Sequence, residues 1–384
     1  MNTNPDWRGD CLVRGAGPAG SICSTLLARA GYRTLLIAGT APSRWRPPEI
    51  LAPATIRLLR QHGFLAAATD GFVRCRGVYG KWAAKPEFFD YELLACEAAV
   101  SIDRALFDSR LRKEALQSGV EIWSDVFVQR THYDARQWTI TGQRRGLPHV
   151  CEAPLLIEAT GRSGPAAPIP QTRRAYSDRL LALACPLTLP RRDCQLMLLE
   201  ADNEGWWYST CDGNGGAAVV YLSDADLLPT GPAQRALFFR QRFETSWLMR
   251  KKLPELPQNL RLHTLDARTY YRHPCAGPAS LAIGDAAYSV DPLSGAGIRR
   301  AIEMAVKSVS ATKGFYAEKS SSKALQNYAR WVLSEFVRWR KTKDSVYSTA
   351  DPTLFAHEFW RRRVISRGAG MVSAANVDPT ELPR

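Results

Sequence analysis

Residues 10–39 read DCLVRGAGPAGSICSTLLARAGYRTLLIAG, and this stretch decides the fold. A short apolar strand ends at Arg14, and a G-x-G-x-x-G turn follows it. A helical stretch then runs to about Ala30 and leads into a β-prone run from Arg33 to Ile37. This order of strand, glycine turn, helix and strand is typical of a βαβ unit that binds a dinucleotide. The sequence therefore predicts a Rossmann-like unit here.

The glycine turn predicts a separate role for each of its glycines. The turn consists of Gly15, Ala16, Gly17, Pro18, Ala19 and Gly20. Gly15 permits the tight bend, Gly17 lets the backbone approach a pyrophosphate, and Gly20 lets the helix pack close to the strand. Two features depart from the usual pattern. Arg14 replaces an apolar residue, and the second strand ends in Ile37-Ala38-Gly39, without the acidic residue that binds an adenosine ribose.

A second strand–turn–helix unit occupies residues 281–298, LAIGDAAYSVDPLSGAGI. An apolar strand ends at Gly284 and Asp285, and the turn before the helix contains Gly295, Ala296 and Gly297, with Ile298 at the helix start. Such a helix N-terminus presents free N–H groups and a positive dipole end to an anion or an electron-rich ring edge. Asp285 can accept hydrogen bonds from a polyol. Together with LLIEATGRSG (155–164), these segments predict one long ligand that meets several strand ends.

The element pattern predicts an α/β (α+β) protein with a discontinuous nucleotide-binding domain. That domain is expected at 1–75, 100–165 and 275–312, where apolar strands alternate with helices. Residues 76–99 and 166–274 are expected to form an inserted substrate domain, which is an antiparallel sheet. Residues 313–384 are expected to form a helical C-terminal region. KSSSK (319–323) is typical of a flexible linker.

At the level of motifs, the chain resembles the FAD-dependent monooxygenases of the p-hydroxybenzoate-hydroxylase fold. The glycine turn, the ATGRSG segment and the 281–298 unit occur in that family's order and spacing. Further segments resemble the branch that contains tryptophan halogenases and geranylgeranyl reductases: PPEILAPATIRLLRQHGF (47–64), SIDRALFD (101–108), GWWYST (205–210) and HEFWRRR (357–363). The similarity is closest to flavoprotein maturases that oxygenate a tryptophan of a partner protein during quinone cofactor biogenesis, such as those of lysine ε-oxidase, glycine oxidase and quinohemoprotein amine dehydrogenase.

The resemblance implies a cofactor and a role for each motif. It implies non-covalent FAD, with dioxygen as co-substrate and electrons from NAD(P)H or an external reductase. In this alignment Pro292 lies beside the isoalloxazine, and the Gly295–Ile298 turn holds the pyrimidine edge. Asp285 and Arg104 bind the ribityl chain or the phosphates. The aromatic strand then places Trp206 and Tyr208 against an aromatic substrate.

Glu49 and Asp291 are the best candidates for a catalytic acid or base, because both lie near the flavin in the family pattern. A structural role as a cap or as a salt-bridged carboxylate is an equal alternative for each. Lys81 and Lys85 invite comparison with a halogenase lysine, but GVYGKWAAKPEF does not match that context. GWWYST also departs from the W-x-W-x-I-P pattern of halogenases, so hydroxylation ranks above halogenation.

Composition limits the possible partners. Lys and Arg number 51 against 37 Asp and Glu, which gives a net charge of +14 and favours an acidic partner polypeptide. No nucleic-acid-binding motif, zinc spacing or apolar run of membrane-spanning length is present in the sequence. We expect neither a metal nor nucleic acid, and the polar N-terminus favours a cytoplasmic enzyme.

Three functions remain open from the sequence. The first is an oxygenating flavoenzyme that acts on an aromatic substrate, either a tryptophan of a partner polypeptide or a small molecule. The second is a flavin reductase of the geranylgeranyl-reductase type. The third is a non-catalytic flavin-bearing protein that assists the folding of an oxidase.

Overall fold

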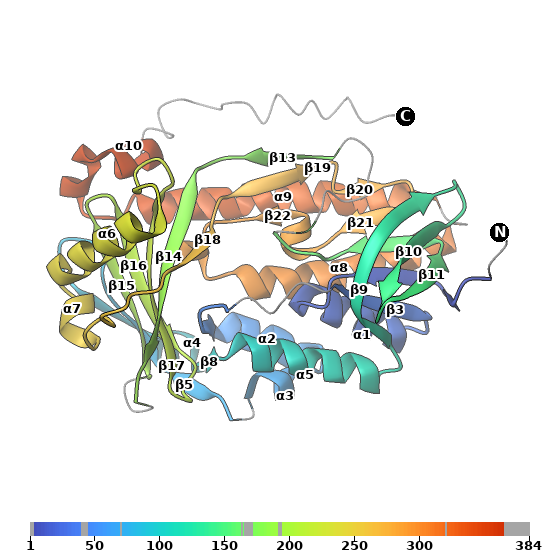
Figure 1. Ribbon diagram of the computed structural model, residues 1–384, viewed down its shortest axis with the longest axis horizontal. Helices are drawn as coiled ribbons and strands as arrows, with labels where there is room; N and C mark the ends of the chain where they lie inside the picture. Colours follow the sequence, from blue (N-terminus) through green and yellow to red (C-terminus); the bar gives the residue numbers. More distant parts are fainter. Residues whose placement is uncertain are drawn as a thin grey trace.

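The computed structural model describes residues 4–39, 45–69, 71–162, 164, 172–190, 194–318 and 321–364 (Figure 1). Three sequence-based expectations fall partly outside these residues. They are Ser163 of the ATGRSG segment, two positions of the KSSSK segment, and the last twenty residues of the expected helical region.

The larger domain is built on a nine-stranded sheet with the predicted βαβ unit at its centre. In sheet order the strands are β1 (Trp7–Arg8), β11 (Leu147–Ala153), β10 (Trp138–Arg144), β9 (Glu121–Tyr133), β3 (Thr34–Gly39), β2 (Cys11–Arg14), β12 (Leu155–Glu158), β21 (Ser280–Ala282) and β20 (Ala276–Gly277). The central pairs β9–β3–β2–β12–β21 are parallel. All four residues of β2 and of β12 are buried. The first three residues of each strand are apolar, and the charged residues at the two strand ends, Arg14 and Glu158, form an ion pair at 3.5 Å.

Helices flank this sheet, and those that follow the two glycine turns begin at Pro18 and Gly297, as the sequence predicts. The helices of this part are α1 (Pro18–Arg29), α2 (Pro53–Gln61), α3 (Leu65–Thr69), α5 (Arg104–Gln117), α8 (Gly297–Ala317) and α9 (Lys323–Tyr347). Pro18 occupies the first turn of α1, where its missing N–H has no intrahelical partner to lose. The helical repeat expected after residue 313 is confirmed in α9, which buries Leu325, Tyr328, Val332, Phe336 and Trp339.

A seven-stranded sheet, which we call the substrate sheet, lies beside the larger domain, at the left of Figure 1. In order its strands are β18 (His263–Asp266), β14 (Leu180–Thr188), β17 (Gly216–Asp224), β16 (Gly205–Cys211), β15 (Leu196–Asp202), β6 (Gly77–Lys81) and β7 (Glu87–Asp90). The sheet is antiparallel, as expected, except where β6 pairs in parallel with β15. A strand from residues 77–81 can join in this way because the long intervening segment lets the chain return in the same direction.

Short elements connect these layers. One three-stranded sheet consists of β13 (Arg173–Tyr176), β19 (Tyr270–His273) and β22 (Tyr288–Ser289). A second consists of β4 (Glu49–Leu51), β8 (Ala99–Ile102) and β5 (Val73–Cys75). The remaining helices are α4 (Tyr91–Ala95), α6 (Pro232–Thr245), α7 (Met249–Lys252), α10 (Glu358–Val364), and the 3-10 turns η2 (Gly284–Ala286), η3 (Pro292–Ser294) and η4 (Pro352–Ala356).

The substrate sheet buries a different cluster on each face. Trp207 packs with Phe239 and Phe243 of α6 on one face. Trp206 packs on the opposite face in a cluster that includes residues of α9 and α10. This alternation follows from the two-residue period of a strand. None of the helices in the described part of the chain combines the length and apolar character that a membrane crossing demands.

Candidate active site

The first glycine turn brings two of the three sequence segments into contact. Gly15 adopts a φ of +106°, and a Cβ atom on it would lie 2.8 Å from the backbone nitrogen of Thr160, after β12. A Cβ on Gly20 would collide with the carbonyl oxygen of Gly15, so this position needs glycine for close packing. A Cβ on Gly17, by contrast, would meet no atom within 4 Å. The space in front of Gly17 is therefore open, as a bound pyrophosphate requires.

The third segment joins the other two through Gly284. This residue adopts a φ of +59°, and a Cβ on it would lie 2.9 Å from the Cβ of Ala19 in the first turn of α1. The loop after β21 thus packs directly on the glycine turn after β2. The carboxyl ends of β2, β12 and β21 meet at one edge of the sheet, which is where ligands of open α/β sheets bind.

The second glycine turn opens a long helix toward free space. The 21-residue helix α8 begins at Gly297, and Gly295 before it adopts a φ of +56°. A Cβ on Gly295 or on Gly297 would meet no atom within 4 Å. The dipole and free N–H groups of α8 are thus available to an electron-rich ligand group. Both helix N-termini that the sequence assigns to one ligand have room for it, so the chain fits FAD.

Asp285 is held by two arginines. Its Oδ1 lies 3.2 Å from Nη2 of Arg300, and its Oδ2 lies 3.5 Å from Nε of Arg162. Arg300 is buried, and its Nη1 donates a 3.1 Å hydrogen bond to the carbonyl oxygen of Tyr288. The carboxylate itself remains about one-third exposed (35%), so it keeps room to accept hydrogen bonds from a ligand.

Arg104, predicted to bind the cofactor, pairs with Glu49, predicted to be catalytic. Nη1 of Arg104 donates to Oε1 of Glu49, and Nη2 lies 3.3 Å from Oδ2 of Asp108, one turn along α5. Burial opposes the charge of Arg104, but the two carboxylates outweigh burial and raise its pKa. The guanidinium therefore ties β4 to α5. Glu49 remains half-buried at the edge of this pair.

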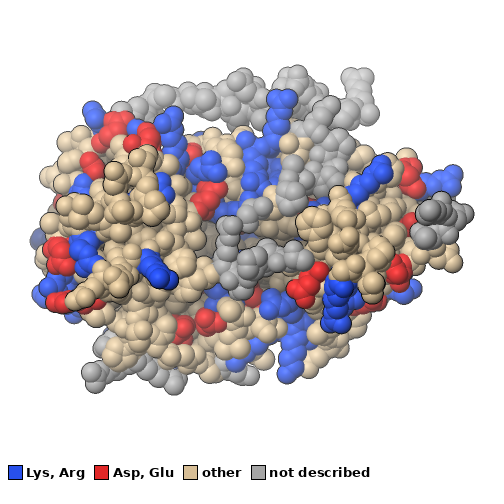
Figure 2. All heavy atoms as spheres, in the orientation of Figure 1, with Lys and Arg blue, Asp and Glu red and all other residues tan. Residues whose placement is uncertain are grey.

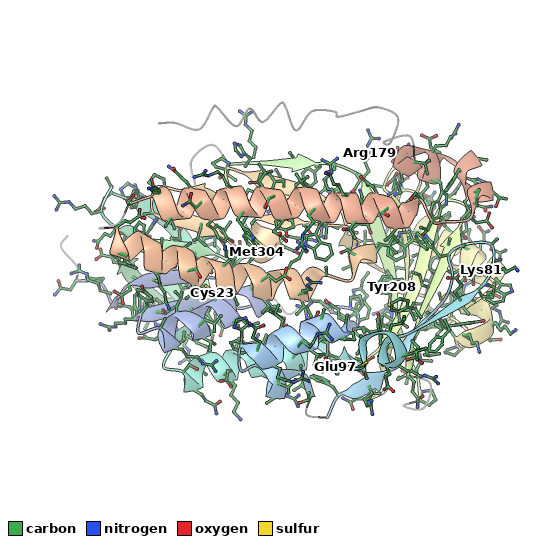
Figure 3. All side chains as sticks on the ribbon, turned by 180° about the vertical axis from the view of Figure 1, so that it is seen from behind. Cys23, Lys81, Glu97, Arg179, Tyr208 and Met304 are labelled. Atoms are coloured by element: carbon green, nitrogen blue, oxygen red, sulfur yellow. The ribbon has the colours of Figure 1, made fainter. Side chains whose placement is uncertain are left out.

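A row of aromatic side chains lies between the two predicted carboxylates. Tyr208 and Trp206 extend from β16 with ring centroids 5.8 Å apart, and Tyr208 lies on the substrate sheet beside the larger domain (Figure 3). Thr210 of β16 donates a 2.7 Å hydrogen bond to the carbonyl oxygen of Pro48, so Glu49 lies near this end of the row. Burial, and then the charge of Glu49, raise the pKa of Tyr208. At the other end, Nε1 of Trp206 donates a 3.0 Å hydrogen bond to the hydroxyl of Tyr347.

Asp291 receives the last bond of that chain. The hydroxyl of Tyr347 donates to Oδ2 of Asp291 at 2.7 Å, and the backbone N–H of Leu293 donates to Oδ1 at 2.9 Å. Asp291 is buried, and burial raises its pKa, while Lys343 and Arg363 act in the opposite direction. Because both carboxylate oxygens accept hydrogen bonds, Asp291 fixes the η3 turn immediately before Gly295.

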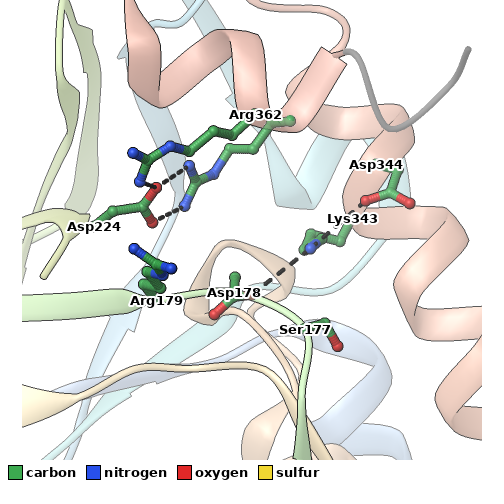
Figure 4. Close-up of a pocket in the computed structure, with 8 residues that line it drawn as sticks. Ser177, Asp178, Arg179, Asp224, Lys343, Asp344 and Arg362 are labelled. Atoms are coloured by element: carbon green, nitrogen blue, oxygen red, sulfur yellow. Dashed lines mark hydrogen bonds and ion pairs between the residues drawn. The ribbon is translucent and has the colours of Figure 1, made fainter. Parts of the chain in front are cut away.

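Ion pairs hold the C-terminal helices over the aromatic row. Arg363 of α10 pairs with Asp224 at the end of β17, and Lys343 of α9 lies 3.8 Å from Asp178. These side chains line a hollow of about 330 Å³, and the pairs are drawn in Figure 4. Trp360 of α10 completes the cover by donating a 2.8 Å hydrogen bond to the carbonyl oxygen of Asp202. Each charged side chain that lines this hollow has an oppositely charged neighbour, so these ion pairs attach α9 and α10 to the rest of the protein.

The sequence missed Tyr347, Arg300 and Trp82. Tyr347 and Arg300 lie on the buried faces of α9 and α8, where the helical spacing of the sequence gives no sign of a role beyond packing. Trp82 follows β6 and contacts the rings of Trp206 and Tyr347. The halogenase-like candidate Lys81, the last residue of β6, lies over the ring of Trp247, 5.5 Å from its centroid (Figure 3).

Comparison with known proteins gives the family. The sequence profile of the FAD binding domain matches residues 8–333. The tryptophan 2-halogenase of Chondromyces crocatus is 24% identical over 354 residues, which cover 88% of this chain and 67% of the relative. LodB of Marinomonas mediterranea, classed provisionally as a FAD-dependent oxidoreductase, is 24% identical over 363 residues, which cover 92% and 96%.

A solved structure extends the comparison to the whole fold. QhpG, a peptidyl tryptophan dihydroxylase essential for tryptophylquinone cofactor biogenesis, superposes with a TM-score of 0.78 at 22% identity. The superposition covers 93% of this chain and 78% of QhpG. The predicted α/β fold, the FAD cofactor and the oxidoreductase class are confirmed by these matches. The chain belongs to the FAD binding domain family, and it is similar in sequence to a tryptophan 2-halogenase and in fold to QhpG.

Proposed function

We propose that this protein hydroxylates an aromatic substrate, and that the substrate is a tryptophan side chain of a partner polypeptide. The observation that carries the proposal is the row from Tyr208 through Trp206 to Tyr347, which has Glu49 at one end and Asp291 at the other. Trp206, Tyr347 and Asp291 are buried, whereas Tyr208 and Glu49 are partly exposed, so the Tyr208 end of the row offers an aromatic face and a carboxylate to a substrate ring.

When bound, FAD supplies the activation of dioxygen that protein side chains cannot perform. The protein's part is to bind, orient and exclude water. The N–H groups of Gly297 and Ile298 would stabilise negative charge at the flavin pyrimidine edge, with Pro292 beside the ring. Gly17 and Asp285 would hold the pyrophosphate and the ribityl chain, and Arg104 would contribute its charge to the same ligand.

The two carboxylates take different roles in this proposal. Glu49 is half-exposed and paired on one side only, so it can accept a proton from the substrate. Asp291 is a positioning residue, because its hydrogen bonds hold the η3 turn and, through Tyr347, the indole of Trp206. Trp206 is 1% exposed, so its ring supports the site from behind, whereas Tyr208 is partly exposed and can contact a substrate.

Several features support a polypeptide substrate. The fold is shared with QhpG, whose described substrate is peptidyl tryptophan. The net charge of +14 favours association with an acidic surface, and Figure 2 shows basic and acidic groups interleaved over one face. The position of Lys81 over Trp247 favours hydroxylation over halogenation, because the lysine contacts that ring and not the aromatic row.

Co-expression tests the proposal. The protein is produced with each product of the genes beside its own, and tryptic peptides of those products are mapped by mass. We expect one tryptophan-containing peptide to gain one or two oxygen atoms, only when this protein is present. Efficient hydroxylation of free small aromatics, with no change in any co-expressed protein, would reject the polypeptide substrate and keep the monooxygenase.

A further inference from the structure

An apolar surface lies on the outer edge of the substrate sheet. Strand β7 is an edge strand, paired only with β6 among the described strands. Together with α4 it exposes four large apolar side chains within seven residues: Phe88, Phe89, Leu93 and Leu94. Leu93 is 81% exposed and Leu94 60%. We call these four side chains and the outer backbone of β7 the edge surface. A free strand edge with adjacent apolar groups is a template for an added strand.

The charges around the edge surface favour an acidic partner. Arg76 is 62% exposed while its carboxylate partner Asp90 is 13% exposed. Likewise, Arg74 is more exposed than its partner Glu92, and Arg57 and Arg60 are more exposed than their partner Glu97. In each pair the guanidinium projects farther into solvent than the carboxylate. The arginines are thus the more exposed partners of these pairs, beside one exposed carboxylate on β7, that of Glu87. A second copy of this protein, with the same arginines and a net charge of +14, would be repelled.

The edge surface is also within reach of the aromatic row. The sheet order β16-β15-β6-β7 puts an added strand four spacings from β16, or about 19 Å at about 4.8 Å per spacing. An extended chain covers that distance with about six residues at roughly 3.3 Å each. Strand β6, which pairs with β7, is followed directly by Trp82, and the ring of Trp82 contacts that of Trp206.

We propose that the edge surface docks an extended, acidic segment of the partner polypeptide, by strand addition to β7, about six residues from the tryptophan that enters the site. This inference rests on the proposed polypeptide substrate and names the surface that recognises it. Backbone hydrogen bonds to β7 supply affinity, and the apolar side chains select alternate positions of the segment. The docking surface thereby separates recognition of the partner from the chemistry at the aromatic row.

The test uses a synthetic peptide with one tryptophan flanked by alternating valine and glutamate, and a second peptide with lysine for glutamate. The variant is Leu93→Glu combined with Leu94→Glu, which changes exposed positions without disturbing the core. The matched control is Leu237→Glu, because Leu237 in α6 is 59% exposed on the same domain. Peptide affinity is measured by fluorescence anisotropy, and backbone protection by hydrogen exchange.

We expect the acidic peptide to bind and to slow amide exchange in β7. Its affinity should fall at least about tenfold in the double variant and stay unchanged in the control, and the lysine peptide should bind more weakly. Equal affinity for the variant and the control, binding of neither peptide, or a dimer of this protein that the double variant dissociates would each overturn the proposal. Mass analysis with labelled dioxygen separates the two claims. If the double variant and the wild type add the same amount of oxygen to the acidic peptide, the docking proposal is wrong and the proposed function stands. If the peptide binds at β7 but gains no oxygen, the proposed substrate is wrong and the docking surface stands.

Discussion

The hydroxyl group of Tyr347 donates a 2.7 Å hydrogen bond to the carboxylate of Asp291, and this bond joins the end of α9 to the η3 turn that precedes α8. The same hydroxyl accepts a 3.0 Å bond from Trp206 of the substrate sheet. One side chain therefore connects the three parts of the candidate site. The position of the aromatic row relative to the η3 turn depends on it.

Replacing Tyr347 with Phe tests this connection. The change removes the hydroxyl that bonds the indole N–H of Trp206 and Oδ2 of Asp291, at a cost of roughly 1–3 kcal/mol per buried group. Tyr328→Phe is the matched control, because Tyr328 lies in the same helix and donates to one carbonyl oxygen, that of Ala282. Denaturant unfolding should show a larger loss for Tyr347→Phe. A loss no larger than that of the control would mean that the connection contributes nothing.

Asp291 should make stability fall as pH rises. Burial raises its pKa above the unfolded value of about 4, so the folded state binds the proton more tightly. The stabilisation by that proton is complete below the unfolded pKa and is lost as pH rises through the folded pKa. Asp291→Asn removes this titration, so its unfolding free energy should change less with pH above about 4 than that of the wild type. Identical pH profiles of the two proteins, measured by urea unfolding, would exclude a perturbed Asp291.

Asp285 should contribute to FAD affinity beyond its ion pairs. Asp285→Asn removes the charge but keeps the shape, and we expect FAD to bind about tenfold more weakly, which is roughly 1.4 kcal/mol. Asp266→Asn is the control, because Asp266 also lies near Arg162 and has a similar exposure, 36% against 35%. Flavin fluorescence titration measures both. An equal loss in the two variants would assign the effect to Arg162 instead of Asp285.

Gly17→Val should separate folding from cofactor binding. The backbone of Gly17 is extended, with φ −81° and ψ −174°, and its added side chain meets open space, so the variant should fold normally. The same side chain fills the room needed by the pyrophosphate, so FAD affinity should fall at least about tenfold, with Gly17→Ala intermediate. A valine variant that is folded by circular dichroism and binds FAD as the wild type does would remove the turn from the cofactor site.

Local patterns in the sequence predicted the fold well where each residue's role is set by its own element. Gly15, Gly20 and Gly295 are needed for backbone reasons that a motif records. The helix of 325–339 shows its buried face through its spacing. The alternation of Trp206 and Trp207 between two cores likewise follows from the strand period.

Contacts between distant elements could not be predicted in this way. Tyr347 lies 56 residues from Asp291 and 141 from Trp206, and nothing in its local sequence distinguishes it from a core tyrosine. The pairing of Arg104 with Glu49 depends on how β4 approaches α5. The parallel β6–β15 pair also joins segments more than a hundred residues apart. Such relationships arise from the tertiary arrangement, and no periodicity encodes them.

Labelled dioxygen tests the central claim most directly. The FAD-loaded protein is reduced without air, then mixed with labelled dioxygen, chloride, bromide and a tryptophan-containing acidic polypeptide, and the product is analysed by mass spectrometry. We expect labelled oxygen on the tryptophan ring and no halogen. A chlorinated or brominated ring, or a product that gains two hydrogens and no oxygen, would contradict the account.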